Sequence, residues 1–234
     1  MDTCRISLQN IGECVEKASE ILHIGGVILY PTDTLYGLGV DALSDAAVAK
    51  VYALKGRDER KPIHCIVTNM DMVSEYAKVD DVERRLAARF LPGPLTLILK
   101  KREGIETGIA RGIDTIGIRI PDYPFCLALA KKFGKPITTT SANRSGQKTG
   151  RNVKEILEQL SGGDAYASLL PARRSLGAGG QKTAIENIDL VIDAGELPGR
   201  LPSTVVDVSG DRPLILREGA IPAAYIWDEL QMKY

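Results

Sequence analysis

The sequence predicts an α/β protein built on a twisted sheet of mixed parallel and antiparallel strands, flanked by helices. Short apolar runs of strand length alternate along the chain with segments whose apolar residues recur at helical spacing. Some connections between the expected strands are too short for a helical crossover, and the late strands at 190–192, 205–208 and 214–216 follow one another closely. The sheet is therefore expected to be mixed.

The first expected element is a helix of about four turns that begins after Asn10. Glu13 lies three residues further on, which is the spacing of a capping box, and apolar residues then recur at helical spacing up to Gly25. Ser44 is placed to cap a second helix, which ends near Gly56. The same two periodicities predict the remaining elements: strands at 27–30, 62–67, 95–99, 115–120, 136–140, 190–192, 205–208 and 214–216, and helices at 82–90, 125–133 and 153–160.

Composition limits the classes of function. The chain has 234 residues, of which 30 are Lys or Arg and 30 are Asp or Glu, so it is not a polybasic binder. No clean linker divides it, and we expect a single domain over 1–234. The glycine-rich segment at 162–183 contains Arg173 and Arg174 and is interpreted as a mobile loop, either a solvated insertion or a lid or partner contact.

The cysteines and the N-terminus favour a cytoplasmic protein. Cys4, Cys14, Cys65 and Cys126 are dispersed, with no C-x-x-C motif, and we expect all four to be buried and reduced. The first residues show no signal peptide. The longest apolar stretches have the length of strands, well short of the roughly 18 residues that a membrane helix needs, so no membrane contact is expected.

Cations lie at strand ends and helix ends, where they could converge on an anion. Lys55, Arg57 and Lys61 fall close together after the second helix, either as a polyanion site or as a solvated helix end. Arg119 stands inside an apolar run and Arg217 ends another, so each needs a polar face or an anion. In a neutral protein these charges predict a concave, positively charged cleft for a small polyanion.

Hydroxyl-rich turns supply the complementary groups. The segment 138–143 follows an expected strand and offers hydroxyls and backbone N–H groups suited to phosphate oxygens, and 32–34 and 203–204 offer the same at two other strand ends. A turn of this kind more often bonds only to itself, so none is decisive alone. Fragments such as Gly180-Gln181-Lys182-Thr183 lack the spacing of a phosphate-binding loop, and two histidines make a Ser-His-Asp triad improbable.

Taken together, these segments resemble one family. The chain carries Tyr30-Pro31-Thr32-Asp33-Thr34-Leu35-Tyr36-Gly37, Lys55-Gly56-Arg57, Leu91-Pro92-Gly93-Pro94-Leu95-Thr96, Gly117-Ile118-Arg119-Ile120-Pro121, Thr140-Ser141-Ala142-Asn143-Arg144-Ser145-Gly146 and Ser203-Thr204-Val205-Val206-Asp207. Their order and spacing are similar to those of the YrdC-like threonylcarbamoyl-adenylate synthases. The resemblance covers about residues 10–220 and implies the short, single-domain form.

The resemblance implies an enzyme that joins L-threonine, bicarbonate and ATP into threonylcarbamoyl-AMP and releases pyrophosphate. Mg²⁺ is expected to accompany the ATP, without a metal site of the protein's own. A tRNA-modifying transferase complex would accept the product. Bicarbonate, a phosphate oxygen or Asp33 could take the proton of the threonine amine.

The resemblance also implies roles for individual residues. The catalytic set is Lys55, Arg57, Ser141 and Asn143; the residues expected to bind ATP are Arg57, Lys61, Thr115, Ser141, Thr149 and Arg217; those expected to bind threonine are Thr34, Arg119, Thr139 and Ser203. Arg119 is a natural partner for a carboxylate.

Two departures from the family pattern bear on these roles. Ile66 stands where some long members have a histidine in the threonine pocket, and Asp58 replaces a proline beside the expected phosphate site. An alternative function is a double-stranded RNA or ribosome-associated binding protein of the same fold, with weak binding of RNA duplexes or tRNA. Zero net charge and a single Trp count against it. A carbamoyl-adenylate step like that in hydrogenase maturation proteins is a weaker option.

Overall fold

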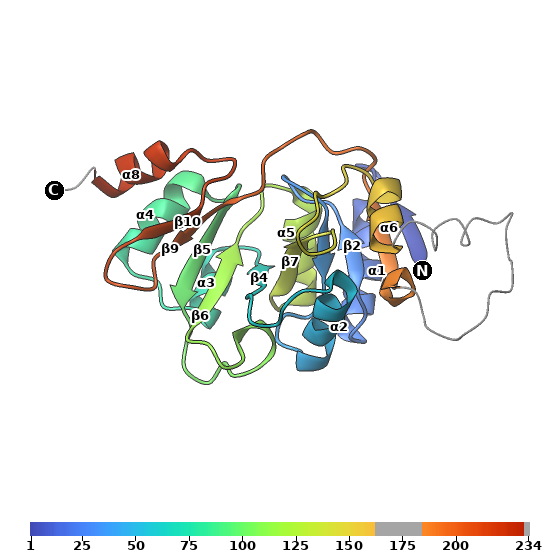
Figure 1. Cartoon of the computed structure of the whole chain (residues 1–234), viewed down its shortest axis with the longest axis horizontal. Helices are drawn as coiled ribbons and strands as arrows, with labels where there is room; N and C mark the ends of the chain where they lie inside the picture. Colours follow the sequence, from blue (N-terminus) through green and yellow to red (C-terminus); the bar gives the residue numbers. More distant parts are fainter. Residues whose placement is uncertain (162–183, 232–234) are drawn as a thin grey trace, which may run out of the picture.

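The computed structural model describes residues 1–161 and 184–231. These residues form one mixed sheet with helices on both faces, as the sequence predicts (Figure 1). The segment 162–183, interpreted from sequence as a mobile loop, lies outside the described residues. Within the described part of the chain, no helix is both long enough and apolar enough to span a membrane.

The described elements follow the predicted order closely. The strands are β1 (Asp2–Arg5), β2 (Ile28–Tyr30), β3 (Gly37–Gly39), β4 (His64–Ile66), β5 (Leu95–Lys100), β6 (Thr115–Arg119), β7 (Ile137–Ser141), β8 (Leu190–Asp193), β9 (Thr204–Asp207) and β10 (Leu214–Arg217). The helices are α1 (Ile11–His23), α2 (Asp45–Lys55), α3 (Met70–Tyr76), α4 (Asp81–Phe90), α5 (Pro124–Phe133), α6 (Val153–Ser161) and α8 (Ala223–Gln231), with short 3₁₀ turns η1 (Gly108–Ala110) and η2 (Ala184–Asn187).

The sheet has ten strands in the described residues, in the order β1-β8-β2-β3-β7-β4-β6-β5-β9-β10. Parallel pairs join β8 to both β1 and β2, β4 to β6, and β5 to β9, and the other neighbouring pairs are antiparallel. Figure 1 shows α4 and α8 beside the β9–β10 end of the sheet, whereas α1 and α6 lie toward the β2 end.

Two apolar clusters pack on opposite faces of the sheet, because successive side chains of a strand point to opposite sides. The larger cluster packs α2, α3, α4, α6 and α8 against one face, and it includes Leu95, Leu97 and Leu99 of β5. The smaller one packs α1 and α5 against the other face, over β2 and the ends of β4 and β7. Neither Thr96 of β5 nor Arg119 of β6 belongs to either cluster, so polar groups occupy this part of the second face.

Two sequence predictions are wrong near the N-terminus. Cys4 and Cys14 form a disulfide, because β1 and the start of α1 place their Cα atoms 6.0 Å apart, so only Cys65 and Cys126 are free and buried as predicted. Burial raises the pKa of both free thiols. The predicted capping box at the start of α1 does not form, because the Asn10 side chain makes no hydrogen bond to the first turn of the helix. Asn10 Oδ1 instead accepts a hydrogen bond from the backbone N–H of Ser7.

The predicted cap of α2 does form, and it gives a direct test of the local assignment. Ser44 Oγ accepts a hydrogen bond from the Ala47 backbone N–H at 3.3 Å. Ser44→Ala should lower the free energy of unfolding by about 1 kcal/mol, whereas Ser44→Asp should keep the stability of the parent, because aspartate caps equally well. Urea unfolding followed by circular dichroism measures both. Equal losses in the two variants would contradict the cap.

Candidate active site

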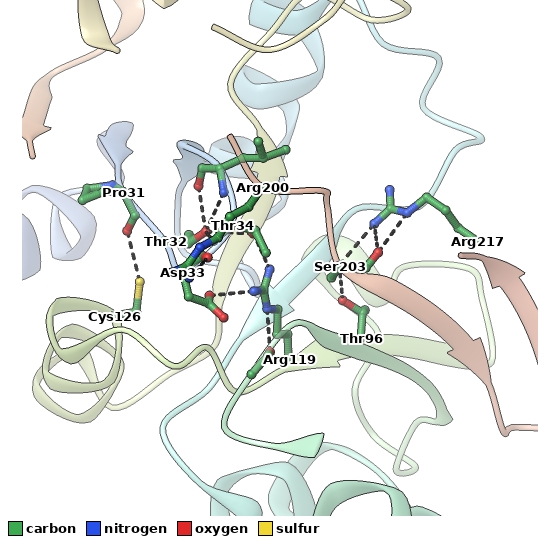
Figure 2. A network of polar contacts seen from close by, with 12 residues as sticks. Pro31, Thr32, Asp33, Thr34, Thr96, Arg119, Cys126, Arg200, Ser203 and Arg217 are labelled. Carbon is green, nitrogen blue, oxygen red and sulfur yellow. Dashed lines mark hydrogen bonds and ion pairs between the residues drawn. The ribbon is translucent and has the colours of Figure 1, made fainter. Parts of the chain in front are cut away.

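Arg119 is a buried cation at the end of β6. Its guanidinium donates Nε–H to Gly93 O at 3.0 Å, Nη1–H to Thr34 Oγ1 at 2.8 Å and Nη2–H to Asp33 Oδ1 at 2.6 Å (Figure 2). Arg119 is 4% exposed and Asp33 is 7% exposed, so their ion pair is shielded from water. Because a guanidinium has five N–H donors, two remain, one on each terminal nitrogen. A carboxylate could accept both.

The turn that carries Asp33 is fixed from within and from outside. Thr32 Oγ1 accepts hydrogen bonds from the backbone N–H groups of Thr34 and Leu35 at 3.1 and 3.2 Å, so the hydroxyl turns the chain in place of a backbone carbonyl. Arg200 donates Nη1–H to Asp33 O at 2.8 Å (Figure 2). The turn is therefore held in position before any ligand arrives.

A second polar cluster surrounds Ser203, just before β9. Its hydroxyl lies 2.9 Å from Thr96 Oγ1, and Arg217 of β10 donates to both the carbonyl and the hydroxyl of Ser203 at 2.8 and 3.1 Å (Figure 2). Burial and the charge of Arg119 lower the pKa of Arg217. Gly219 lets the chain return against this cluster, because a Cβ there would lie 2.6 Å from the Ser203 carbonyl carbon.

A cavity of about 310 Å³ opens beside the Asp33 turn. Its wall is formed by Asp33, Thr34, Pro92, Gly93, Pro94, Asp122, Arg200, Leu201 and Ala220. This volume is at the lower end for small-molecule sites, and the wall combines apolar surface with two carboxylates and one guanidinium. Such a lining can hold a small zwitterion.

Lys55, the last residue of α2, organises the turn after β7. Its Nζ donates to Ser141 O, to Asn143 O at 2.8 Å and to Asn143 Oδ1 at 3.1 Å. The Ser145 N–H returns a bond to Lys55 O at 2.9 Å. Lys55 is 2% exposed, and burial together with the charge of Arg57 lowers its pKa to about 7. All three donors of the ammonium are thus already used within the protein.

Arg57 and Lys61 lie in the loop that follows α2. Arg57 donates to Lys61 O at 3.1 Å and to Pro62 O at 3.0 Å, which leaves part of its fork exposed, and the Lys61 side chain is exposed. Asp58 pairs with Arg60 at 2.8 Å. The acid that departs from the family pattern is therefore neutralised by its own loop.

The other predicted site residues lie around the central strands. Thr139 of β7 stands opposite His64 of β4, and Thr115 stands opposite Lys100 at the start of β6. Thr149 follows the turn that Lys55 holds, and it is half-buried. The structure thus brings Thr34, Arg119 and Asp33 into direct contact and joins Lys55 to Ser141 and Asn143.

Sequence reasoning missed several residues that shape this region. Arg200 carries no signal in the sequence, because a single arginine in a short segment with glycine and proline is usual in a surface loop. Thr96 is the one polar residue in the apolar run 95–99, but a single threonine is common in a buried strand and does not by itself indicate a site. His64 carries no signal of its own in the sequence, because a single histidine in a short apolar run is more often structural than functional.

The described residues contain no group of three or more His, Cys, Asp or Glu side chains that could hold a metal ion. Two carboxylates of this region already have cationic partners: Asp33 binds Arg119 and Asp58 binds Arg60. The donor set therefore does not fit a dedicated metal site in this part of the chain. A divalent cation that accompanies a nucleotide would take most of its ligands from phosphates and water.

The fold and the site define an α/β protein with a mixed sheet whose polar residues gather around the central strands. The Sua5_yciO_yrdC family model, described as telomere recombination, matches residues 20–172. The chain is 38% identical over 203 residues to a putative threonylcarbamoyl-AMP synthase of Methanocaldococcus jannaschii, covering 87% of this chain and 84% of the relative. The chain therefore belongs to the Sua5–YciO–YrdC family.

Further relatives include both longer proteins and one of similar length. The threonylcarbamoyl-AMP synthase of Pyrococcus abyssi is 30% identical, and the match covers 91% of this chain but 57% of that relative. The crystal structure of P. abyssi Sua5 complexed with L-threonine has a TM-score of 0.78 at 29% identity, covering 98% of this chain and 60% of that one. E. coli YciO has a TM-score of 0.72 at 26% identity, covering 94% and 95% of the two chains.

Removing the buried acid should be costly for folding. Asp33→Ala leaves the Arg119 charge buried with no counter-ion, and we expect a loss of about 3 kcal/mol in the free energy of unfolding. Chemical denaturation measures it. Asp58→Ala is the matched control, because its ion pair with Arg60 is exposed, and it should leave stability unchanged. A small loss for Asp33→Ala would show that the pair does not hold the turn.

The lowered pKa of Lys55 predicts a pH dependence of nucleotide binding. Below about pH 7 the Lys55 ammonium donates hydrogen bonds to three acceptors. Above this pH the neutral amine has only two N–H donors and carries no charge. ATP affinity should therefore fall about threefold to tenfold from about pH 6 to about pH 8.5. Titration calorimetry on the parent and on Lys55→Met tests this. An equal fall in Lys55→Met would assign the effect to another group.

Proposed function

We propose that the protein is an L-threonylcarbamoyladenylate synthase, a nucleotidyltransferase that converts L-threonine, bicarbonate and ATP into threonylcarbamoyl-AMP, pyrophosphate and water. The observation that carries the proposal is the Arg119 cluster, in which a buried guanidinium has two unused N–H donors and binds three residues of the wall of a small cavity, Asp33, Thr34 and Gly93. The family membership, and the relative solved with L-threonine, support the same substrate.

Threonine would bind at the Arg119 cluster. Its carboxylate would accept the two free N–H groups of Arg119, and the hydroxyls of Thr34, Thr139 and Ser203 would surround the rest of the molecule. Asp33 holds the Arg119 guanidinium in place, so the cation is already oriented when threonine arrives.

ATP would bind toward the α2–β4 loop and the turn after β7. Arg57 has part of its fork exposed there, and Lys61 is a flexible point charge. We propose that Lys61, Thr115, Thr149 and Arg217 complete the nucleotide site. Lys55 acts one step away from the phosphates, because its donors hold the backbone of Ser141 and Asn143 in shape. Mg²⁺, bound to the phosphates of ATP, would offset their charge.

The chemistry then depends mainly on positioning and fixed charge. The threonine amine attacks the carbon of bicarbonate, a water leaves, and a carbamate forms. An oxygen of the carbamate attacks the α-phosphate, and the bond to pyrophosphate breaks. The acyl-adenylate is then passed to a transferase complex that modifies tRNA.

The test is to incubate the purified chain with ATP, Mg²⁺, bicarbonate and labelled L-threonine. We expect pyrophosphate release that requires both threonine and bicarbonate. Arg57→Ala should mainly abolish ATP-dependent turnover, and Arg119→Ala should mainly weaken threonine binding, by about 100-fold, because it removes a charged pair of donors. Lys154→Ala, an exposed change on α6, serves as the control.

Two outcomes would reject the proposal. One is pyrophosphate release that does not depend on threonine. The other is no release, together with tight binding of RNA duplexes, which would favour a nucleic-acid-binding protein of the same fold. Normal binding of both ligands by both arginine variants would leave the activity standing but would reject the site map.

A further inference from the structure

His64 lies next to residues of the candidate site, although the site as proposed gives it no role. It is the first residue of β4, opposite Thr139 of β7 on one side and beside Gly117 of β6 on the other. Its strand neighbours Ile63 and Cys65 face the larger apolar cluster, and Ile66 belongs to the smaller one. His64 shares the face of Ile66 but lies outside that cluster and is half-buried.

Gly117 of β6 leaves the space that the His64 ring occupies. A Cβ at Gly117 would lie 2.9 Å from Cγ of His64 and closer still to Cδ2, so any other residue there would push the imidazole away. The same Cβ would also lie 2.9 Å from the tip of Ile98. The absence of a side chain at Gly117 therefore gives the ring its place across β6.

The ring has no hydrogen-bond partner among the described residues, in contrast to His23, whose Nδ1 lies 2.8 Å from Ser19 O. Burial, together with the positive charges of the nearby Arg217 and Arg57, lowers the pKa of His64 to about 4. The imidazole is therefore neutral at physiological pH, with one N–H donor and one acceptor nitrogen available.

We propose that His64 is a catalytic residue that touches the substrates, donating its imidazole N–H to the carbamate formed from threonine. This inference rests on the proposed function. Thr139, on one side of His64, is a residue predicted to bind threonine, whereas Arg57 and Arg217 are predicted to bind ATP. The group that joins the two substrates is the carbamate, so a donor between the two sets of residues meets the carbamate where it approaches the α-phosphate.

A neutral donor suits this position. Arg57 and Arg217 already supply positive charge for the phosphates, and a third cation would be repelled by them. A neutral N–H can still stabilise the negative oxygen of the carbamate, because hydrogen bonds to charged groups are strong in a site that excludes water. No proton has to leave the imidazole in the reaction.

The test compares His64→Leu with His64→Gln, whose amide keeps an N–H donor. In the pyrophosphate assay, His64→Leu should lower kcat about 10- to 100-fold with KM for threonine and ATP changed less than about twofold, and His64→Gln should recover most of the loss. His23→Gln is the matched control and should retain parental kcat. Thermal unfolding shows whether each variant is folded.

A second measurement, independent of turnover, follows the imidazole nitrogen chemical shifts of the two histidines by NMR. Threonine, bicarbonate and a non-hydrolysable ATP analogue, added together, should shift the ring of His64 and leave that of His23 unmoved. Parental kcat in His64→Leu, equal losses in His64→Leu and His64→Gln, or an unmoved His64 resonance would each overturn the inference while the synthase remains active. A parental chain with no threonine-dependent release would overturn the synthase and this role together.

Discussion

The buried pair between Arg119 and Asp33 is the constraint around which the site is organised. A guanidinium cannot stay charged inside an apolar strand unless its donors are satisfied, so β6 must draw in the turn of Asp33 and the carbonyl of Gly93. These groups come from segments distant in sequence, and their convergence defines one wall of the cavity. The cost of burying the charge is offset by hydrogen bonds that also fix the geometry.

The cations of the family motifs fall into two groups, buried ones that hold the protein backbone and more exposed ones that can reach a ligand. Lys55 and Arg119 are buried and give most of their donors to the protein, so they build the shape of the site. Arg57 and Lys61 are more exposed and lie in a loop, so they are free to follow the charge of a ligand. A motif read from sequence groups these residues together, whereas the structure separates residues that hold the backbone from residues that can reach the substrate.

The sequence predicted the class of sheet and most elements, because long apolar runs and helical periodicity report burial directly. It missed the helices α3 and α8 and the strands β3 and β1. Gly37–Gly39 has too few residues to show alternation, and β1 is a short strand of mostly exposed residues paired along one side. It also missed the disulfide, since the separation of Cys4 and Cys14 in sequence says nothing of how β1 meets α1.

At the site, the sequence identified residue types and their grouping, and the Arg119 cluster and the contact of Lys55 with Ser141 and Asn143 agree with that grouping. It could not reveal that Asp33 is the partner of Arg119, or that Arg200 holds the Asp33 turn, because both contacts cross long stretches of chain. Nor could it show that Gly117 makes room for His64, which depends on the register of two strands.

The strand order has a consequence for how the chain reaches this state. β8 lies between β1 and β2, and β9 and β10 extend the sheet beyond β5, so strands that follow β1–β7 in the chain complete both halves of the sheet. Until residues near 190 are made, β1 and β2 have no common neighbour, and Ser203 and Arg217 join the site only later. Contacts that span so much of the chain make folding slow and leave strand edges open in the meantime. While residues 190–217 are still being made, the nascent chain therefore carries exposed edges on β1, β2 and β5, and exposed strand edges favour aggregation.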